Sequence, residues 1–428
     1  MRPRVALPDQ HQITIGGFHH SSIRVVDITE QQHLHELSGQ IDRQGDMYAI
    51  TVAPSQPGPR TLFAFTTPNR IQPGNLIGNP ASTWHVNGQG AEMIILSHNN
   101  MLSAAKRLQQ WREAQGLSVA LIDIQDLYDA FAFGAKDPQA IKAFLHDAKR
   151  HWQPAPRFAL LIGAASYDPR DYLGYGPSDW LPTNWIATEL LETASDDGFV
   201  DFDHDSVADM PIGRLPARSD AEAAAMVDKL LAHERTSGAW RQRALVVTAA
   251  PGDFDFRTAS EPLQQWLANH LTVDTLPLEQ VTLAAARQQL VEGLSEGYGL
   301  ATYLGHGTTD RWDAGGLLDT AAVRTLQNRN RLPIVLSMTC LSGFFQDPVT
   351  ESLAEALLRS PTGGAAAVWA SSGLTRPPGQ VEMQRVVVEH LLGAGALPLG
   401  EAILKAKQAW PGDARTWILF GDPAMRFD

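Results

Sequence analysis

The sequence predicts an α/β protein in which mostly parallel strands, covered by helices, follow a small antiparallel β-domain. Two observations support this prediction. Up to about residue 90, polar and apolar residues alternate between Gly, Pro and Asn, a pattern typical of half-buried strands. From residue 91 onward, uniformly apolar strand-like runs alternate with amphipathic helical segments, which indicates a parallel sheet buried on both faces. The length of 428 residues also favours more than one domain, since single cores stop growing at roughly 250–300 residues.

The first element, residues 1–90, is predicted to be the antiparallel β-domain. Four runs in it alternate polar and apolar side chains, so each strand would bury one face. They are ITIGGF (13–18), SIRVVDI (22–28), MYAITVA (47–53) and RTLFAFTT (60–67).

Residues 91–215 are predicted to form a first α/β subdomain. Its expected strands are AEMIILSH (91–98), LSVALIDI (117–124) and RFALLIGAA (157–165). Its expected helices are MLSAAKRLQQWREAQG (101–116), ended by Gly116 as a left-handed cap, and AIKAFLHDAKRHW (140–152). The polar segment 163–215 is too long for an ordinary connection, and we expect a functional or inserted loop region on the surface.

Residues 216–428 are predicted to form a second α/β subdomain that carries the chemistry. The helix SDAEAAAMVDKLLAHERT (219–236) leads into it. Expected strands are ALVVTAA (244–250), YGLATYLGHG (298–307), RLPIVLSMTC (331–340) and GGAAAVWASSG (363–373). Expected helices are SEPLQQWLANHL (260–271), LAAARQQLVEG (283–293), TAAVRTLQN (320–328) and ESLAEALLR (351–359).

The composition narrows the possible functions. Lys and Arg total 34 against 47 Asp and Glu, and the net charge of −13 has the wrong sign for neutralising nucleic-acid phosphates. We therefore expect no nucleic-acid partner. No apolar run approaches the roughly 20 residues that cross a bilayer, so no membrane span is expected. The N-terminus shows no signal peptide, which leaves a cytoplasmic protein or a piece of a longer secreted chain.

Cys340 is the only cysteine, which excludes an internal disulfide and a cysteine-rich metal site. It ends one predicted strand, and His306 ends the preceding one, between Gly305 and Gly307. Carboxyl ends of adjacent parallel strands meet at one edge, where α/β sheets bind ligands. A thiol and an imidazole there suit attack on a carbonyl, and the amides of Gly307 and Cys340 are candidates to hold the oxyanion. The alternatives are a buried core cysteine and an ordinary turn histidine.

Several longer strings resemble the catalytic domain of gingipain-type cysteine peptidases, which belong to the caspase-like clan. They include YLGHGTTDRW (303–312), LPIVLSMTCLSGFF (332–345), TESLAEALLRSPTGGAAAVWASSGLT (350–375) and LFGDPAMRF (419–427). The resemblance covers about residues 90–428. It implies a caspase-like fold and an endopeptidase that cleaves protein or peptide substrates through a thioester, with His306 and Cys340 as the catalytic dyad. It also implies a bacterial protein that is secreted or held at the cell surface as part of a longer precursor. The proposed chemistry requires no cofactor.

The acid partner of the histidine is less well defined. Members of this family usually carry Asp or Glu on the strand-end loop before the dyad, and here Pro251 stands near that position. Asp253 is our first candidate and Asp255 our second, and both could instead be solvated loop acids. Two further departures are Ala164, where the family has an acid, and Thr339, where it often has a smaller residue.

The resemblance also implies a pocket for the substrate residue before the cut. Glu261 falls where arginine-specific members carry an acid, and it could pair with a substrate Arg. The alternative is an acid that complements the dipole at the first turn of a helix. Trp369, Ser371 and Ser372 follow the cysteine strand and are candidates for the pocket wall.

The loop DFDHDSVADMP places Asp201, Asp203, Asp205 and Asp209 at positions one, three, five and nine, an oxygen spacing suited to a structural Ca²⁺. Ser206 replaces the usual loop glycine and no bidentate Glu follows, so a solvated acidic turn is the alternative.

The sequence also contains a motif of another enzyme class. GLSEG (293–297) matches the nucleophile elbow of serine hydrolases, but it lies between a helix and a strand in the reverse order, which makes Ser295 a turn residue. Two alternatives to hydrolysis stay open: a transpeptidase-like surface-protein processor, in which an amine resolves the thioester, and a non-catalytic caspase-like scaffold.

Overall fold

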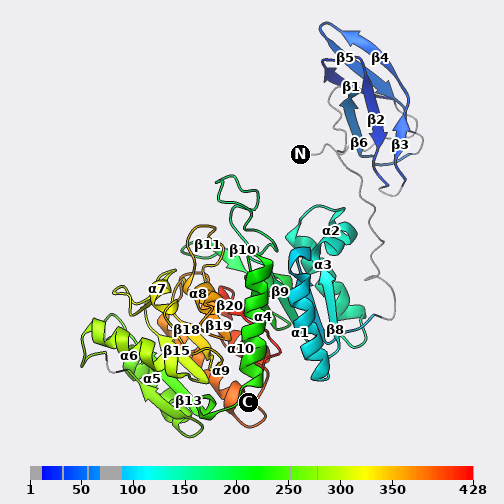
Figure 1. Ribbon diagram of the computed structural model, residues 1–428. Coiled ribbons are helices and arrows are strands. Elements are labelled where there is room, and N and C mark those ends of the chain that lie inside the picture. Colours follow the sequence, from blue (N-terminus) through cyan, green and yellow to red (C-terminus); the bar gives the residue numbers. More distant parts are fainter. Residues whose placement is uncertain are drawn as a thin grey trace. The chain divides into compact units, whose positions relative to one another are not determined.

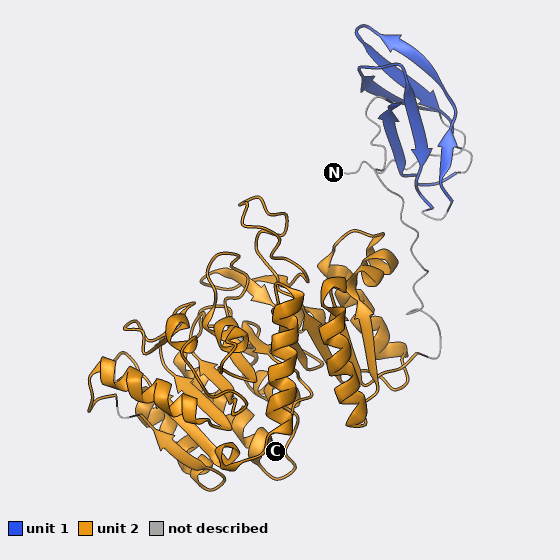
Figure 2. Cartoon of the chain, in the orientation of Figure 1, with its two compact units in different colours: residues 1–81 blue, residues 82–428 orange. Residues whose placement is uncertain are grey.

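The structure is a computed structural model that describes residues 12–30, 33–54, 57–67, 89–250, 252–276 and 278–427, with the backbone alone at Asp413. The chain divides into two compact units, residues 1–81 and 82–428, which are described separately (Figure 2). Parts of the predicted β-domain, and Pro251, lie outside the described residues.

The first unit contains two small antiparallel sheets, as the alternating pattern predicted. One has the order β1 (Ile13–Phe18), β5 (Met47–Val52), β4 (Gly39–Gln44), and the other β3 (His35–Leu37), β2 (Ile23–Asp27), β6 (Leu62–Thr66). The inward-facing residues Ile23, Val25, Ile50 and Val52 form its core. Alternate residues of β2 are buried, which is why polar and apolar side chains alternate in the sequence.

The second unit is built on one ten-stranded sheet covered by helices (Figure 1). The strands in order are β14 (Thr272–Thr275), β13 (Arg243–Thr248), β15 (Leu300–Leu304), β18 (Ile334–Met338), β19 (Ala367–Ser371), β20 (Trp417–Phe420), β12 (Ile212–Leu215), β9 (Phe158–Ile162), β7 (Met93–Ser97) and β8 (Val119–Asp123). Every neighbouring pair is parallel except β19 and β20. The sheet therefore has two parallel halves that run in opposite directions.

The two predicted α/β series thus contribute strands to one sheet, and the expected boundary after residue 215 falls at the end of β12. β20 comes last in the sequence, yet it lies between β19 and β12 and joins the halves. Two-stranded sheets accompany the main one: β10 (Asn184–Ala187) with β11 (Glu192–Ser195), and β16 (Arg311–Trp312) with β17 (Leu318–Asp319).

Helices cover the sheet on both faces. They are α1 (Leu102–Ala114), α2 (Ile124–Ala132), α3 (Pro138–His151), α4 (Asp220–Arg235), α5 (Phe256–Ala268), α6 (Leu283–Glu296), α7 (Thr320–Val323), α8 (Leu353–Arg359), α9 (Pro377–Leu392), α10 (Leu399–Ala409) and α11 (Pro411–Ala414), with short 3₁₀ turns η2 (Asn99–Met101), η3 (Asp197–Phe199) and η4 (Ala239–Gln242).

The central strands are buried on both faces, which explains their uniformly apolar sequences. In β7, Met93 and Ile95 belong to one hydrophobic cluster with α1, whereas Ile94 and Leu96 belong to a second cluster with α3. Among the described residues, the helices are all too short or too polar to cross a bilayer.

The prediction that residues 163–215 form a surface loop region is wrong for its second half. This segment contains the buried turn η3 and the sheet strand β12, all four of whose residues are buried. β12 is only four residues long, lies between Pro211 and Pro216 and contains Arg214, so the sequence gives no apolar run. Arg214 is fully buried because Asp196 and three backbone carbonyls accept its hydrogen bonds.

Candidate active site

Three adjacent strands of one half-sheet deliver the candidate catalytic residues. β13, β15 and β18 are parallel neighbours, with Thr248 beside Leu304 and Leu304 beside Met338 at their carboxyl ends. Asp253 lies on the loop after β13, His306 two residues after β15, and Cys340 two residues after β18. The sheet therefore places all three at one edge, as expected for ligand sites of parallel sheets.

His306 is held by a carboxylate and an aromatic ring. Its Nε2 lies 2.8 Å from Oδ1 of Asp253, and its ring meets that of Phe256 edge-on, with centroids 5.2 Å apart. The hydrogen bond and the positive charge of a protonated His306 lower the pKa of Asp253. The imidazole is about half exposed, with 53% of its side-chain surface accessible. The ring is thus oriented and still open to solvent.

The backbone of His306 is also fixed. Its carbonyl accepts hydrogen bonds from the hydroxyl of Tyr303 at 2.7 Å and from the amide of Asp313 at 2.9 Å. Tyr303 stacks on Trp312, with ring centroids 4.6 Å apart, and both rings are buried. This aromatic support anchors the loop from which the imidazole projects.

Cys340 contacts the segment that follows β19. The amide of Thr375 donates to Sγ at 3.3 Å, and Sγ lies 3.6 Å from the Thr375 carbonyl and 3.7 Å from its hydroxyl. The next residue, Leu341, has a left-handed φ of 58° and donates its amide to the carbonyl of Gly373. Within the described part of the chain, no hydrogen bond joins Sγ to His306.

Gly307 brings the histidine loop against the cysteine loop. A Cβ at this position would lie 2.6 Å from Oγ1 of Thr339 and 3.0 Å from the carbonyl of Arg311, so only glycine fits. The hydrogen bonds of the described residues do not use the amide N–H groups of Gly307 and Cys340. Both donors thus remain available to an oxyanion.

Two acids that the sequence suggested for the site, Asp255 and Glu261, lie away from His306 in the hydrogen-bond pattern of the described residues. Asp255 caps α5, accepting hydrogen bonds from the amide and hydroxyl of Thr258, and it does not contact His306. Glu261 lies on an exposed face of α5, past its first turn, and has no partner among the described residues. Ser295 lies in the last turn of α6, where its hydroxyl accepts from the amide of Gln327.

The three residues expected on the pocket wall are fully buried. Trp369 packs against Trp417, with ring centroids 5.1 Å apart. The Ser371 hydroxyl donates to the carbonyl of Gly373, and the Ser372 hydroxyl donates to the carbonyl of Ala194. Trp369, Ser371 and Ser372 thus belong to the interior of the protein. The residue that contacts Cys340 is Thr375, four residues beyond β19. Thr375 was not predicted, although the rule that ligands bind at strand ends also covers the end of β19.

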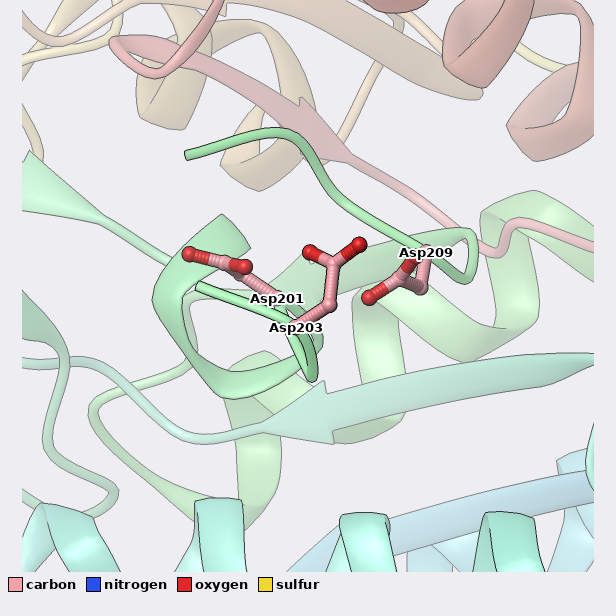
Figure 3. A group of neighbouring side chains, drawn as sticks. All are labelled: Asp201, Asp203 and Asp209. Atoms are coloured by element: carbon pink, nitrogen blue, oxygen red, sulfur yellow. The ribbon is translucent and has the colours of Figure 1, made fainter. Parts of the chain in front are cut away.

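Three of the four predicted calcium ligands lie together (Figure 3). One carboxylate oxygen each of Asp201, Asp203 and Asp209 lies within 4.8 Å of the other two. The Oδ1 atom of Asp201 is buried and has no hydrogen-bond partner within the described residues, which fits a cation in this loop. Asp205 is not part of this group, and its carboxylate accepts a hydrogen bond from the amide of Val207.

The chain shares a family profile with known peptidases. The profile of peptidase family C25 matches residues 87–428. An uncharacterized protein of Archaeoglobus fulgidus is 23% identical over 288 residues, which span 62% of this chain and 70% of that protein.

Solved structures share the fold. The Arg specific cysteine proteinase gingipain R superposes with a TM-score of 0.65 at 19% identity, covering 82% of this chain and 80% of that one. The complex of Porphyromonas gingivalis RgpB pro- and mature domains gives a TM-score of 0.66 at 20% identity, covering 78% of this chain and 79% of the other.

Proposed function

The chain belongs to peptidase family C25, and we propose that it cleaves peptide bonds through Cys340 as nucleophile and His306 as general base and acid. Family membership makes it a cysteine-type endopeptidase with protein substrates. The observation that carries the finer proposal is the placement of Asp253, His306 and Cys340 after three adjacent parallel strands.

In the proposed acylation step, His306 takes the proton of the Cys340 thiol and Sγ attacks the carbonyl carbon of the scissile bond. The negative oxygen that forms accepts hydrogen bonds from the amides of Gly307 and Cys340. When the C–N bond breaks, the imidazolium gives its proton to the departing amine, which leaves a thioester.

In deacylation, a water molecule loses a proton to His306 and attacks the thioester carbonyl. The C–S bond then breaks, Sγ leaves as a thiolate, and the carboxylic acid product forms. Asp253 is proposed to orient the imidazole through Nε2 and to stabilise its protonated form. Before attack, rotation of the Cys340 side chain would exchange its contacts with Thr375 for contact with His306.

The proposal is tested with a peptidyl acyloxymethyl ketone, an electrophile that captures an activated thiol. We expect mass spectrometry to find one modification, at Cys340, in the native protein and none in the Cys340→Ala variant. A His306→Ala variant should react far more slowly, since the thiol loses its base. Native protein that stays unmodified would contradict the proposal and support a non-catalytic scaffold. Products formed from a peptide with and without an added amine then distinguish hydrolysis from transpeptidation.

A further inference from the structure

A groove adjoins the segment that contacts the cysteine. It has a volume of about 420 Å³ and is bordered by Leu374 and Arg376, the two residues that flank Thr375. Since the Thr375 amide lies 3.3 Å from Sγ of Cys340, the groove begins close to the nucleophile. Residues 186–190 form another part of the groove wall, and Gly412, Arg415 and Thr416 complete the lining.

Residues 186–190 include the end of β10, a strand with one free edge. β10 pairs with β11 on one side, and no strand of the described residues pairs with its other side. A free edge presents unpaired N–H and C=O groups, to which an extended peptide can add as a further strand. β10 supplies Ile186 and Ala187 to the groove, so the end of this strand borders a space that a peptide can enter.

The hairpin of β10 and β11 is held firmly against the sheet. The Thr193 hydroxyl donates to the carbonyl of Ser372, and the Ser195 hydroxyl donates to the carbonyl of Arg415. At the turn, the Thr188 hydroxyl accepts from the amide of Leu191. The groove wall is therefore fixed before any peptide binds, which lowers the entropy cost of binding.

The charges in the groove favour an acidic ligand. Arg376 pairs with Glu189, and both side chains are largely exposed. Arg415 also lines the groove, and no carboxylate in the described part of the chain pairs with its guanidinium. Among the described lining residues, Arg376, Arg415 and Glu189 together carry one net positive charge, in a protein whose net charge is −13. A guanidinium binds a carboxylate through two parallel hydrogen bonds, so it selects acidic side chains.

We propose that this groove binds substrate in extended form along β10, and that Arg415 selects an Asp or Glu side chain near the cleaved bond. The inference rests on the proposed peptidase function, because it names the substrate class of that site. The peptide backbone would add to the free edge of β10, and its carboxylate would lie against Arg415.

The test uses the Cys340→Ala protein, so that binding is measured without cleavage. Fluorescein-labelled heptapeptides carry Glu, Gln or Lys at one position at a time, and fluorescence anisotropy gives each dissociation constant. We expect one position at which Glu binds about tenfold more tightly than Gln, the gain of a charge-assisted pair. An added Arg415→Glu substitution should reverse this order and favour Lys, while Arg415→Gln should abolish the preference.

Arg426→Glu serves as the matched control, because it makes the same charge change outside this groove. It should leave the preference for Glu unchanged. Equal affinity for Glu and Gln at every position, no binding of any peptide, or an unchanged preference in the Arg415→Glu variant would overturn the inference. Native protein that shows the preference but cleaves none of these peptides would instead contradict the proposed peptidase mechanism.

Discussion

Charged and reactive side chains of the second unit occupy two contrasting settings. At the carboxyl ends of β13, β15 and β18, the side chains of Asp253 and His306 are 76% and 53% exposed. Around β12 and the end of β20, Arg214, Asp196 and Asp422 are almost completely buried. In the first setting the polar groups are accessible to solvent, whereas in the second they are buried.

The buried charged side chains of the second setting are paired with one another. Arg214 donates five hydrogen bonds, two of them to Asp196, and stacks over Phe345. Lys407 donates to both carboxylate oxygens of Asp197. Pairing of this kind is required, because a buried charge without a partner costs several kcal/mol.

Ionisable groups with the most perturbed environments are therefore not the ones that we propose to react. Desolvation raises the pKa of the buried carboxyls of Asp197 and Asp422, although each lies beside a cation. Near the dyad, the shift at Asp253 comes from its hydrogen bond to His306 rather than from burial. The buried pairs hold elements of the sheet together, and the exposed groups at the strand ends are the ones proposed to react.

The largest effect should follow from breaking a buried pair. Asp196→Ala leaves Arg214 charged and without a carboxylate, and we expect a loss of about 3–5 kcal/mol in the free energy of unfolding. Chemical denaturation measures this loss. The exposed-edge control, Asp253→Ala, should leave the denaturation midpoint near that of the native protein. Equal destabilisation by both changes would contradict the contrast between the two settings.

A buried histidine should make the fold sensitive to acid. His233 is fully buried, and desolvation, followed by the charge of Arg241, lowers its pKa to about 4. The unfolded chain, with a histidine pKa of about 6.5, binds more protons between these two values, so stability is lost as the pH falls from 6.5 toward 4. The slope should approach about 1.4 kcal/mol per pH unit.

Denaturation curves across this pH range check the prediction. His233→Gln should flatten the dependence, whereas His390→Gln, a change at an exposed histidine, should preserve it. A His233→Gln protein with the native slope would show that another group causes the acid sensitivity.

Gly307→Ala tests the close contact between the loops that carry His306 and Cys340. The new methyl group would collide with Oγ1 of Thr339, pushing His306 from its position, and we expect kcat/KM to fall about a hundredfold. The second substitution Thr339→Ala removes the nearest atoms and should restore part of the activity. Gly16→Ala, where the nearest atom is 3.6 Å away, serves as control. Full activity of Gly307→Ala would refute this account of the glycine.

Asp253→Asn should have a smaller effect on catalysis. It removes the charge that stabilises protonated His306, and we expect about a tenfold fall in kcat. Because the pKa of Asp253 is lowered, its contribution is present above pH 4 and is lost only as the pH falls through the lowered value. The matched change Asp255→Asn weakens only the helix cap and should leave kcat nearly unchanged. The reverse ranking would assign the acid to Asp255.

The smallest expected effect concerns calcium. If the loop binds Ca²⁺ through Asp201, Asp203 and Asp209, millimolar calcium should raise the unfolding free energy by about 1 kcal/mol without changing kcat. Asp203→Ala should remove the gain, whereas Asp205→Ala should preserve it. No stabilisation of the native protein by calcium would leave the loop as a solvated acidic turn.

The sequence predicted the strands whose residues are apolar throughout, and with them the positions of His306 and Cys340, since both follow directly from a buried run. It also ranked Asp253 above Asp255, in agreement with the hydrogen bond to His306. It missed β12, which contains Arg214. An arginine is expected at the surface, and Arg214 is buried here because it pairs with Asp196, which the sequence does not reveal.

The groove beside Thr375 could not be predicted from the sequence either. Trp369, Ser371 and Ser372 follow the expected pattern, but their burial depends on β20 and on residues 193–194, which are distant in the sequence. Leu374, Arg376 and Arg415 line the same groove only because the folded sheet brings their segments together. Local periodicity carries no information about such contacts.

We propose that the exposed strand ends perform the chemistry. The most direct test of this role is the rate at which the native protein and the Cys340→Ala variant cleave a diverse peptide pool, with folding verified by circular dichroism. We predict that the native protein cleaves and that the folded variant falls to the rate of buffer alone. Cleavage by the variant at the native rate would contradict the account.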